Sequence, residues 1–389
     1  MRALFLIKIK DSNMKSLSSS SLLFILLSML VVSGCDTVTF DNQHLDAGNE
    51  GNIDALTEEA LAEAERLTQS FNKLVASSDK NAVYVPAGSE NALADALLKA
   101  GPGGKVILAS GAHYESQTVV ISERVTLVGQ EGATLIVDTN PRPAVSTIDP
   151  ALHIQDASHV SIIGVEIQPA GDAGGTAILA QRSSNLVVAN SQMTNHQVGV
   201  AIEFSNNVQI IKNTFAMTEA SGSEAKQGVV VINGKNPLIA LNTVFNATVG
   251  LFASDSNGRL IKNVTYNNLV GIILCKFPGF PAPDGEFLSA EHSATSWVVA
   301  LNNAHSNAWG YLVIDGASDN TLARTNIASN NSFYDIELAG DTERFGFFSP
   351  TSFQNKVFVN NDNTSVKDCG VDNLIVGGEM IDTAIDPCF

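Results

Sequence analysis

Residues 228–242 read GVVVINGKNPLIALN, and residues 250–263 read GLFASDSNGRLIKN. Each stretch begins with glycine and an apolar run, passes through a polar turn, and ends in a second apolar run followed by asparagine. Short runs rich in valine and isoleucine are typical of β-strands. The glycine returns after 22 residues and the asparagine after 21. A period of this length, with strand-like segments and no helical pattern between them, indicates a β-solenoid.

The two signals recur along most of the chain. The asparagine stands at Asn190, Asn213, Asn242, Asn263, Asn302, Asn326 and Asn360, and the leading glycine at Gly199, Gly228, Gly250, Gly271 and Gly310. In a solenoid each rung pairs its backbone with the rungs above and below, about 4.8 Å away. Asparagine at one corner of successive rungs can exchange amide hydrogen bonds, and it tolerates left-handed backbone angles. We therefore predict an all-β parallel β-helix of about ten rungs between Val106 and Met380, with a structural asparagine ladder.

The repeat divides the chain into parts. Residues 81–360 carry it and form the predicted β-helix. Residues 36–80 combine a polar stretch with acidic, helix-like periodicity, which we interpret as a flexible tether and an acidic stalk helix. A short helix over residues 89–99, with Leu93, Ala96 and Leu97 on one side, is expected to cap the first rung. Residues 361–389 break the asparagine repeat, so we expect a C-terminal cap there.

The N-terminus predicts export. An apolar run from Leu22 to Val32 follows a basic start and is too short to span a membrane. The sequence Val32-Ser33-Gly34-Cys35 resembles a bacterial lipobox, so residues 1–35 are expected to be a lipoprotein signal peptide with lipidation at Cys35. In lipoproteins, an Asp after this Cys resembles an inner-membrane retention signal. Asp36 therefore favours anchoring at the periplasmic face of the inner membrane. The alternative is an ordinary signal peptide with a chance cysteine.

Charge and cysteines limit the function further. The net charge of −18 opposes binding to nucleic acid, and it disfavours acidic polysaccharides unless cations bridge the two. Cys369 and Cys388 bracket a short C-terminal segment, and an exported chain can oxidise them to a disulfide. Cys275 lies in an apolar strand and is expected to be a buried, inert thiol. The histidines show no metal-ligand spacing, so we expect no cofactor; no calcium motif is present, and a bound Ca²⁺ is left open as the alternative.

Candidate ligand-binding residues come from positions within the repeat. Asp255, Lys276 and Asp315 each stand five residues after a leading glycine, so they are expected to form a column on successive rungs. A lysine between two carboxylates can hold a sugar hydroxyl or act in acid–base chemistry. The alternative is a surface ion-pair ladder. Long gaps in the repeat place loops at 216–227, 276–294 and 340–352. In the last of these loops, Arg344 and Phe347 suit either sugar binding or packing onto the β-helix.

Apolar residues at outward positions of the same strands need a cover. Phe252, Ile273 and Leu312 alternate with core positions, so without a cover they would form an exposed apolar strip. The loop that begins Phe277-Pro278-Gly279 is one candidate cover, and a protein partner is the other.

A resemblance supports the fold. The run Gly271-Ile-Ile-Leu-Cys-Lys-Phe-Pro-Gly-Phe-Pro281 resembles a segment of a family of bacterial exported proteins with parallel β-helix repeats. The likeness extends over residues 80–360 and, more broadly, to the pectin-lyase-like superfamily, whose members mostly bind or cleave polysaccharides. It implies a right-handed β-helix. It transfers no catalytic residues, and Cys275 and Lys276 depart from the usual family segment.

Two functions follow as expectations. The first is an envelope lipoprotein that binds or processes a polysaccharide, as a lyase, hydrolase or epimerase if it is an enzyme. The sequence lacks the motifs of the polygalacturonase-like and pectate-lyase-like families, which argues against those two activities. The second is a non-catalytic scaffold that docks another exported protein.

Overall fold

The fold was analysed in a computed structural model. It describes residues 82–140, 149–217, 226–255, 257–276, 291–340, 350–386 and 388, helical residues 55, 58, 59, 61–66, 68–70 and 72, and the backbone of two hairpins. These hairpins are β23 (Phe280–Pro281) with β24 (Phe287–Leu288), and β31 (Thr342–Arg344) with β32 (Phe347–Ser349).

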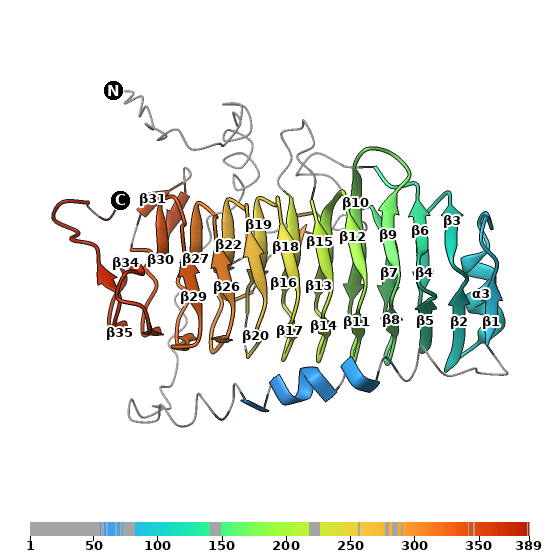
Figure 1. The fold of residues 1–389 in the computed structure, drawn as a ribbon, viewed down its shortest axis with the longest axis horizontal. Coiled ribbons are helices and arrows are strands. Elements are labelled where there is room, and N and C mark those ends of the chain that lie inside the picture. The colour runs from blue at the N-terminus through green and yellow to red at the C-terminus, as the bar shows by residue number, and fades with distance from the viewer. Residues whose placement is uncertain are drawn as a thin grey trace.

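Three parallel sheets, which we call A, B and C, wind around one core (Figure 1). Sheet A contains β1 (Val83–Val85), β2 (Gly104–Leu108), β5 (Val125–Gly129), β8 (Ser161–Ile163), β11 (Val187–Ala189), β14 (Gln209–Ile211), β17 (Leu238–Ala240), β20 (Arg259–Ile261), β25 (Val298–Ala300), β28 (Thr321–Leu322), β33 (Lys356–Phe358) and β35 (Leu374–Val376). Sheet B contains β3 (Gly111–Glu115), β6 (Ala133–Val137), β9 (Glu166–Pro169), β12 (Gln192–Thr194), β15 (Thr214–Ala216), β18 (Thr243–Phe245), β21 (Val264–Tyr266), β26 (Asn303–His305) and β29 (Ile327–Ser329). Sheet C contains β4 (Val119–Ile121), β7 (Pro150–Gln155), β10 (Gly174–Gln181), β13 (His196–Glu203), β16 (Gln227–Ile232), β19 (Val249–Ala253), β22 (Val270–Leu274), β27 (Trp309–Val313), β30 (Tyr334–Leu338), β34 (Ser365–Asp368) and β36 (Glu379–Met380).

The predicted parallel β-helix is confirmed. Each strand pairs in parallel with its counterpart on the next rung, as β17 does with β14 and β20. The sheets have 12, 9 and 11 strands, which agrees with the expected ten or so rungs. Strand alternation separates inside from outside: Val244 of β18 is fully buried in the core, whereas its neighbours Thr243 and Phe245 are half-buried on the outer face.

The asparagine ladder is confirmed at five of its predicted positions. Hydrogen bonds link Asn213, Asn242, Asn263, Asn302 and Asn326 at the corner between sheets A and B. The prediction was wrong for Asn190, which lies in the turn with a φ of 49°. The next residue, Ser191, takes the ladder position and donates its N–H to Asn213 Oδ1 at 3.0 Å. Asn360 is exposed and lies outside the ladder.

The leading glycines form a column of close backbone contacts. A Cβ atom on Gly250 would lie 2.4 Å from the carbonyl oxygen of Gly271, and one on Gly228 would lie 2.5 Å from that of Gly250. Gly271 meets Gly310 in the same way, at 2.7 Å. Carbon and oxygen atoms cannot approach so closely, so a side chain at these positions would push adjacent rungs apart. The glycine signal therefore reflects rung-to-rung packing in sheet C.

Helix α3 (Leu93–Ala100) caps the first rung, as predicted. Leu93 and Ala96 are buried in the main core, and Leu97 packs partly against it. The buried Glu115 side chain accepts the Leu93 N–H at 2.8 Å, which satisfies one free amide at the helix start.

The N-terminal helix, which we define by the helical residues between 55 and 72, is not a free stalk. It runs along the outer face of sheet A (Figure 1). Ala64 is fully buried against small apolar side chains of that sheet, including Ala189, Ala240 and Ala300. Arg259 of β20 also forms an ion pair with Glu63 at 3.3 Å. The stalk interpretation was wrong because outward alanines on sheet A leave room for a helix.

The C-terminal segment differs from the predicted cap over residues 361–389. Strands β34, β35 and β36 extend sheets A and C by further pairing, so residues 365–380 continue the solenoid. The repeat persists through a second ladder at another corner, which joins Asn320, Asn355 and Asn373. Beyond it, the tail folds back: Cys388 forms a disulfide with Cys369, and the Cα atoms are 5.5 Å apart.

Candidate functional site

The three outer faces of the solenoid differ in accessibility. Sheet A carries the N-terminal helix, and the outward side chains in the middle of sheet C are buried. The outward side chains of sheet B are half-buried or exposed on every strand. Sheet B therefore provides the accessible sheet face within the described part of the chain.

Two columns of side chains form this face, which we call the sheet B platform. Strand register aligns the first column as Ala112, Thr134, Glu166, Gln192, Thr214, Thr243, Val264, Asn303 and Ile327. It aligns the second as Tyr114, Ile136, Gln168, Thr194, Ala216, Phe245, Tyr266, His305 and Ser329. Adjacent members of a column lie one rung apart, about 4.8 Å.

Three rings stack in the C-terminal half of the platform, on β18, β21 and β26. Phe245 and Tyr266 have ring centroids 5.0 Å apart and planes inclined by 8°, and Tyr266 and His305 follow at 5.4 Å and 3°. Both faces of Tyr266 are therefore covered, and this ring presents its edge and hydroxyl group outward. The column continues with the small residues Ala216 and Ser329, which leave room beside the terminal rings.

The platform carries little charge. Glu166 is its one carboxylate, and it has neither lysine nor arginine. Glu166 accepts hydrogen bonds from neighbouring uncharged groups: Gln168 Nε2 at 2.6 Å and Thr134 Oγ1 at 3.2 Å. In a chain with a net charge of −18, a surface of threonine, glutamine, asparagine and aromatic groups is distinct in chemistry. Such groups form hydrogen bonds and apolar contacts without requiring an ionic partner.

The predicted column of ligand-binding residues exists, but its two aspartates form hydrogen bonds with the loop that returns to the solenoid. Register places Asp255, Lys276 and Asp315 at the same turn of successive rungs after sheet C. The buried carboxylate of Asp255 accepts backbone N–H groups from Asn233 and His292. Burial raises the pKa of Asp255, and these hydrogen bonds lower it in part. Asp255 therefore fastens the end of the 276–294 loop to the turn.

Lys276 is exposed, and Asp315 is half-buried. The backbone oxygen of Asp315 accepts a hydrogen bond from Ser293 Oγ, so this residue also holds the returning loop. Arg344 lies in β31 and Phe347 in β32, but their side chains lie outside the described part of the structure. The second loop thus adds no described contact to this column.

The outward apolar strip on sheet C is buried. Phe252, Ile273 and Leu312 are each exposed by 4% or less and form one cluster with Cys275, which is also buried. Burial raises the pKa of the Cys275 thiol, which opposes formation of a reactive thiolate. The strip is therefore buried and offers no open docking surface, while the loop from Phe277 that was expected to cover it begins outside the described residues.

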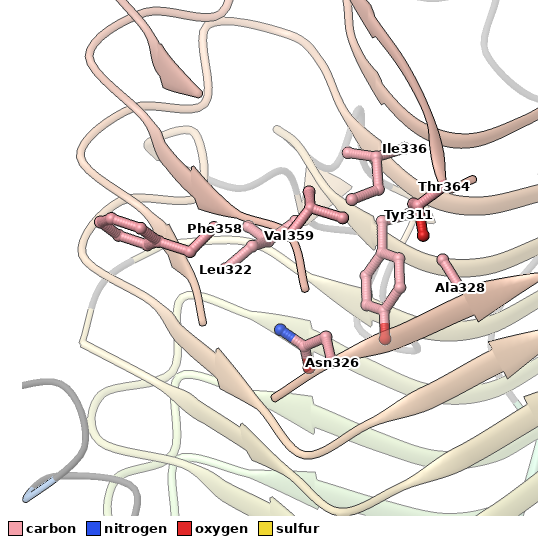
Figure 2. A pocket seen from close by; sticks show the side chains of 8 residues that line it. All are labelled: Tyr311, Leu322, Asn326, Ala328, Ile336, Phe358, Val359 and Thr364. Atoms are coloured by element: carbon pink, nitrogen blue, oxygen red, sulfur yellow. The ribbon is translucent and has the colours of Figure 1, made fainter. Parts of the chain in front are cut away.

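A cavity near the C-terminal rungs has room for about one water molecule. Figure 2 shows its lining by Tyr311, Leu322, Asn326, Ala328, Ile336, Phe358, Val359 and Thr364. The single hydrogen of the Tyr311 hydroxyl already has an acceptor, because the carbonyl oxygens of Asn302 and Ile327 lie 3.1 and 3.3 Å from the phenol oxygen. The cavity lies where sheet B has ended but sheets A and C continue, so it is a packing gap and not a ligand site.

Two further features are absent from the residues that the structure describes. They contain no group of three His, Cys, Asp or Glu side chains arranged to hold a metal ion. They also contain no helix long and apolar enough to cross a membrane.

Sequence reasoning missed the platform, although a signal was present. A ring stands three residues after each of three consecutive ladder asparagines: Phe245 after Asn242, Tyr266 after Asn263, and His305 after Asn302. This constant offset places the rings in one outward column once the ladder is recognised.

Comparison with known proteins agrees with the fold. A family model described as a right-handed beta helix region matches residues 150–280. Together with the observed strand pairing, this match identifies the fold of the chain as a right-handed parallel β-helix. No curated protein matches the chain significantly.

Solved structures with the same architecture are only distantly similar. The A-module of a mannuronan C-5 epimerase from Azotobacter vinelandii is 15% identical with a TM-score of 0.49, over 75% of this chain and 91% of that one. A surface adhesin of Streptococcus pneumoniae is 14% identical with a TM-score of 0.46, over 75% and 88%. A family 28 exopolygalacturonase from Yersinia enterocolitica is 12% identical with a TM-score of 0.34, over 79% and 76%. Likeness at this level concerns the fold alone.

Proposed function

We propose that this protein binds an extended, uncharged polysaccharide along the sheet B platform. The observation that carries the proposal is the accessible, nearly charge-free face with the ring stack of Phe245, Tyr266 and His305 in its C-terminal half. Hydroxyl, amide and imidazole groups on this face match the donors and acceptors of sugar hydroxyls. Ring edges and the methyl groups of threonine match the apolar faces of sugar rings.

The regular spacing of the platform suits a polymer. Equivalent side chains repeat every rung, about 4.8 Å, and an extended β-1,4-linked polysaccharide has a similar rise per sugar. A chain lying along the solenoid axis would meet equivalent contacts at successive sugars. The net charge of −18 opposes an acidic polymer, so the proposed ligand is neutral.

The platform supports binding in preference to cleavage. Glu166 on β9 and His305 on β26 are its carboxylate and imidazole groups, and they lie five rungs apart. At about 4.8 Å per rung, these groups are too distant to act on one glycosidic bond as acid and base. We therefore assign no catalytic residue to this face.

The proposal includes a location. We propose that Cys35 is lipidated and that the chain is held at the cell envelope, with Asp36 favouring the periplasmic face of the inner membrane. A membrane-tethered binding surface would retain a polysaccharide close to the envelope. The lipobox sequence supports this assignment.

A glycan panel tests the function. The full chain is expected to bind neutral extended polysaccharides, and Tyr266→Ala is expected to weaken binding about tenfold, the loss of roughly 1.4 kcal/mol. Tyr84→Ala is the matched control, because Tyr84 is exposed on sheet A, away from the platform. Thermal unfolding of both variants separates lost binding from lost folding. Absence of binding to every neutral and uronic-acid polymer, or equal losses in both variants, would refute the proposal.

A further inference from the structure

The two ends of the solenoid are finished differently. At the N-terminal end, α3 places Leu93 and Ala96 in the core of the first rung. At the C-terminal end, β35 and β36 are the last strands of sheets A and C. Within the described residues, neither a helix nor another strand packs over this last rung.

The last rung offers unpaired backbone edges. The Leu374 N–H donates to the Asn355 carbonyl and the Val376 carbonyl accepts the Val359 N–H, one residue before and one after β33, so strand alternation turns the N–H and C=O of Ile375 toward the open side. Along β36, the Glu379 N–H donates to the Thr364 carbonyl just before β34, and the N–H of Ile381, the residue after β36, donates to the Val366 carbonyl of β34. The backbone groups of Met380 therefore also face outward. Unpaired strand edges of this kind are templates for pairing with another chain.

Apolar side chains accompany these edges. The exposed fractions are 52% for Val371, 38% for Leu374, 52% for Met380 and 83% for Ile385. These are four of the large apolar side chains that remain exposed, and all lie within the last rung or the tail beyond it. Apolar side chains are exposed at the first rung as well, so those of the last rung indicate an interaction surface only together with the unpaired strand edges beside them.

The rim of this end is acidic. Asp362, Asp372, Glu379 and Asp382 are all exposed. This region has two lysines: Lys367 is 2% exposed and forms an ion pair with Asp386 at 3.0 Å, and Lys356 of β33 is half-buried. A second copy of this chain would bring acidic rim against acidic rim, which opposes end-to-end pairing of two copies.

We propose that the open C-terminal rung docks an extended segment of a partner protein that alternates basic and apolar residues. The segment adds as a further strand to the edge at Ile375 or Met380, its apolar side chains cover Leu374 and Met380, and its cations face the acidic rim. This inference rests on the end of the solenoid and is independent of the sheet B platform.

Labelled peptides test the surface on the full chain. The probe is a fluorescent nine-residue peptide in which lysine and valine alternate, and its match has glutamate in place of lysine. The lysine peptide is expected to bind about tenfold more tightly, and high salt to weaken it. N-methylation of its valine amides is expected to abolish binding, because methylated amides cannot pair with a strand edge.

Variants locate the binding. Ile375→Pro removes the outward N–H but keeps the bonds of Leu374 and Val376 to the preceding rung, and is expected to reduce binding at least fivefold. The triple variant Asp372→Lys, Glu379→Lys, Asp382→Lys avoids any backbone change and is expected to reduce it similarly. Glu123→Lys with Glu131→Lys, two exposed acids near the other end, is the control and should bind as the parent chain does.

Three results would overturn the proposal. One is equal affinity for the lysine and glutamate peptides. Another is loss of binding in the Glu123 and Glu131 control to the same extent as in the triple variant. The third is a concentration-dependent dimer in sedimentation that excludes the peptide, because this would assign the open end to a second copy of the chain.

Discussion

Replacement of Asn263 by alanine tests how the rungs are held together. Asn263 is fully buried, and its Oδ1 accepts the backbone N–H of Asn242 at 3.0 Å and the side-chain Nδ2 of Asn242 at 2.9 Å. Its own Nδ2 donates to the Ile239 carbonyl at 2.8 Å and to Asn302 Oδ1 at 2.9 Å. Alanine removes these four bonds and leaves the backbone N–H of Asn242 and one of its two Nδ2 hydrogens unpaired, while the other Nδ2 hydrogen keeps its bond to the Ile210 carbonyl at 2.8 Å.

The expected magnitude follows from the orphaned groups. Each buried donor left without a partner costs about 1–3 kcal/mol. We therefore expect Asn263→Ala to lower the free energy of unfolding by about 3–5 kcal/mol. Equilibrium urea unfolding, followed by circular dichroism and by tryptophan fluorescence, measures this change. Trp297 and Trp309 lie on neighbouring rungs and report on the same region.

Two further variants serve as a partial replacement and as a surface control for Asn263→Ala. Asn263→Ser is expected to lose about half as much, because Ser191 already fills the equivalent position on an earlier rung. Asn207→Gly removes an exposed side chain with a 3.3 Å bond to Asn185 but retains the left-handed backbone, so a loss below about 1 kcal/mol is expected. If Asn263→Ala proved no more destabilising than Asn207→Gly, the ladder would not stabilise the stack through its hydrogen bonds.

Burial lowers the pKa of His196 to about 4. The unfolded chain, in which the histidine pKa is about 6.5, therefore binds a proton more readily than the folded chain. The free energy of unfolding is expected to fall by roughly 3 kcal/mol as the pH drops from about 6.5 to 4. His196→Leu should flatten this dependence in urea unfolding at pH 4.5 and 7.5, and an unchanged profile would contradict the assignment. Gly250→Ala should lower the free energy of unfolding by about 2–4 kcal/mol through the clash with Gly271. In Gly171→Ala the added Cβ would have its nearest contact at 4.0 Å, so the free energy of unfolding should stay within about 0.5 kcal/mol of that of the parent chain. Equal effects in thermal unfolding would count against the clash. Cys35→Ser should abolish incorporation of labelled palmitate and release the chain from membranes, and persistent labelling would exclude Cys35 as the lipid site.

The fold could be predicted because its stabilising interactions are local and repeated. A ladder asparagine contacts the asparagine one rung away, and a leading glycine contacts the next leading glycine. Such contacts leave a period in the sequence. The N-terminal helix leaves no such period, because the position of Ala64 depends on small outward side chains of sheet A that become a groove only after the strands are stacked.

The candidate site was less predictable. Register placed Asp255 in the expected column, but the partners of its carboxylate, the N–H groups of Asn233 and His292, depend on how a long loop returns. The sequence has no period that describes this return. Conversely, Tyr266 became part of a candidate site only when the outer faces of sheets A and C proved to be covered.

The N-terminal helix also has a consequence for the order of folding. Its Glu63 contacts Arg259, 196 residues later in the chain, and its docking groove extends as far as Ala323. Rungs can form successively on their neighbours. The helix can dock only after the strands that line the groove have stacked. The loop that its docking closes is among the longest in the molecule. Its acidic side chains, exposed at Glu58, Glu59 and Glu65, keep it solvated during this interval. The N-terminal helix, although it comes early in the chain, is therefore expected to dock on sheet A only after most of the solenoid has formed.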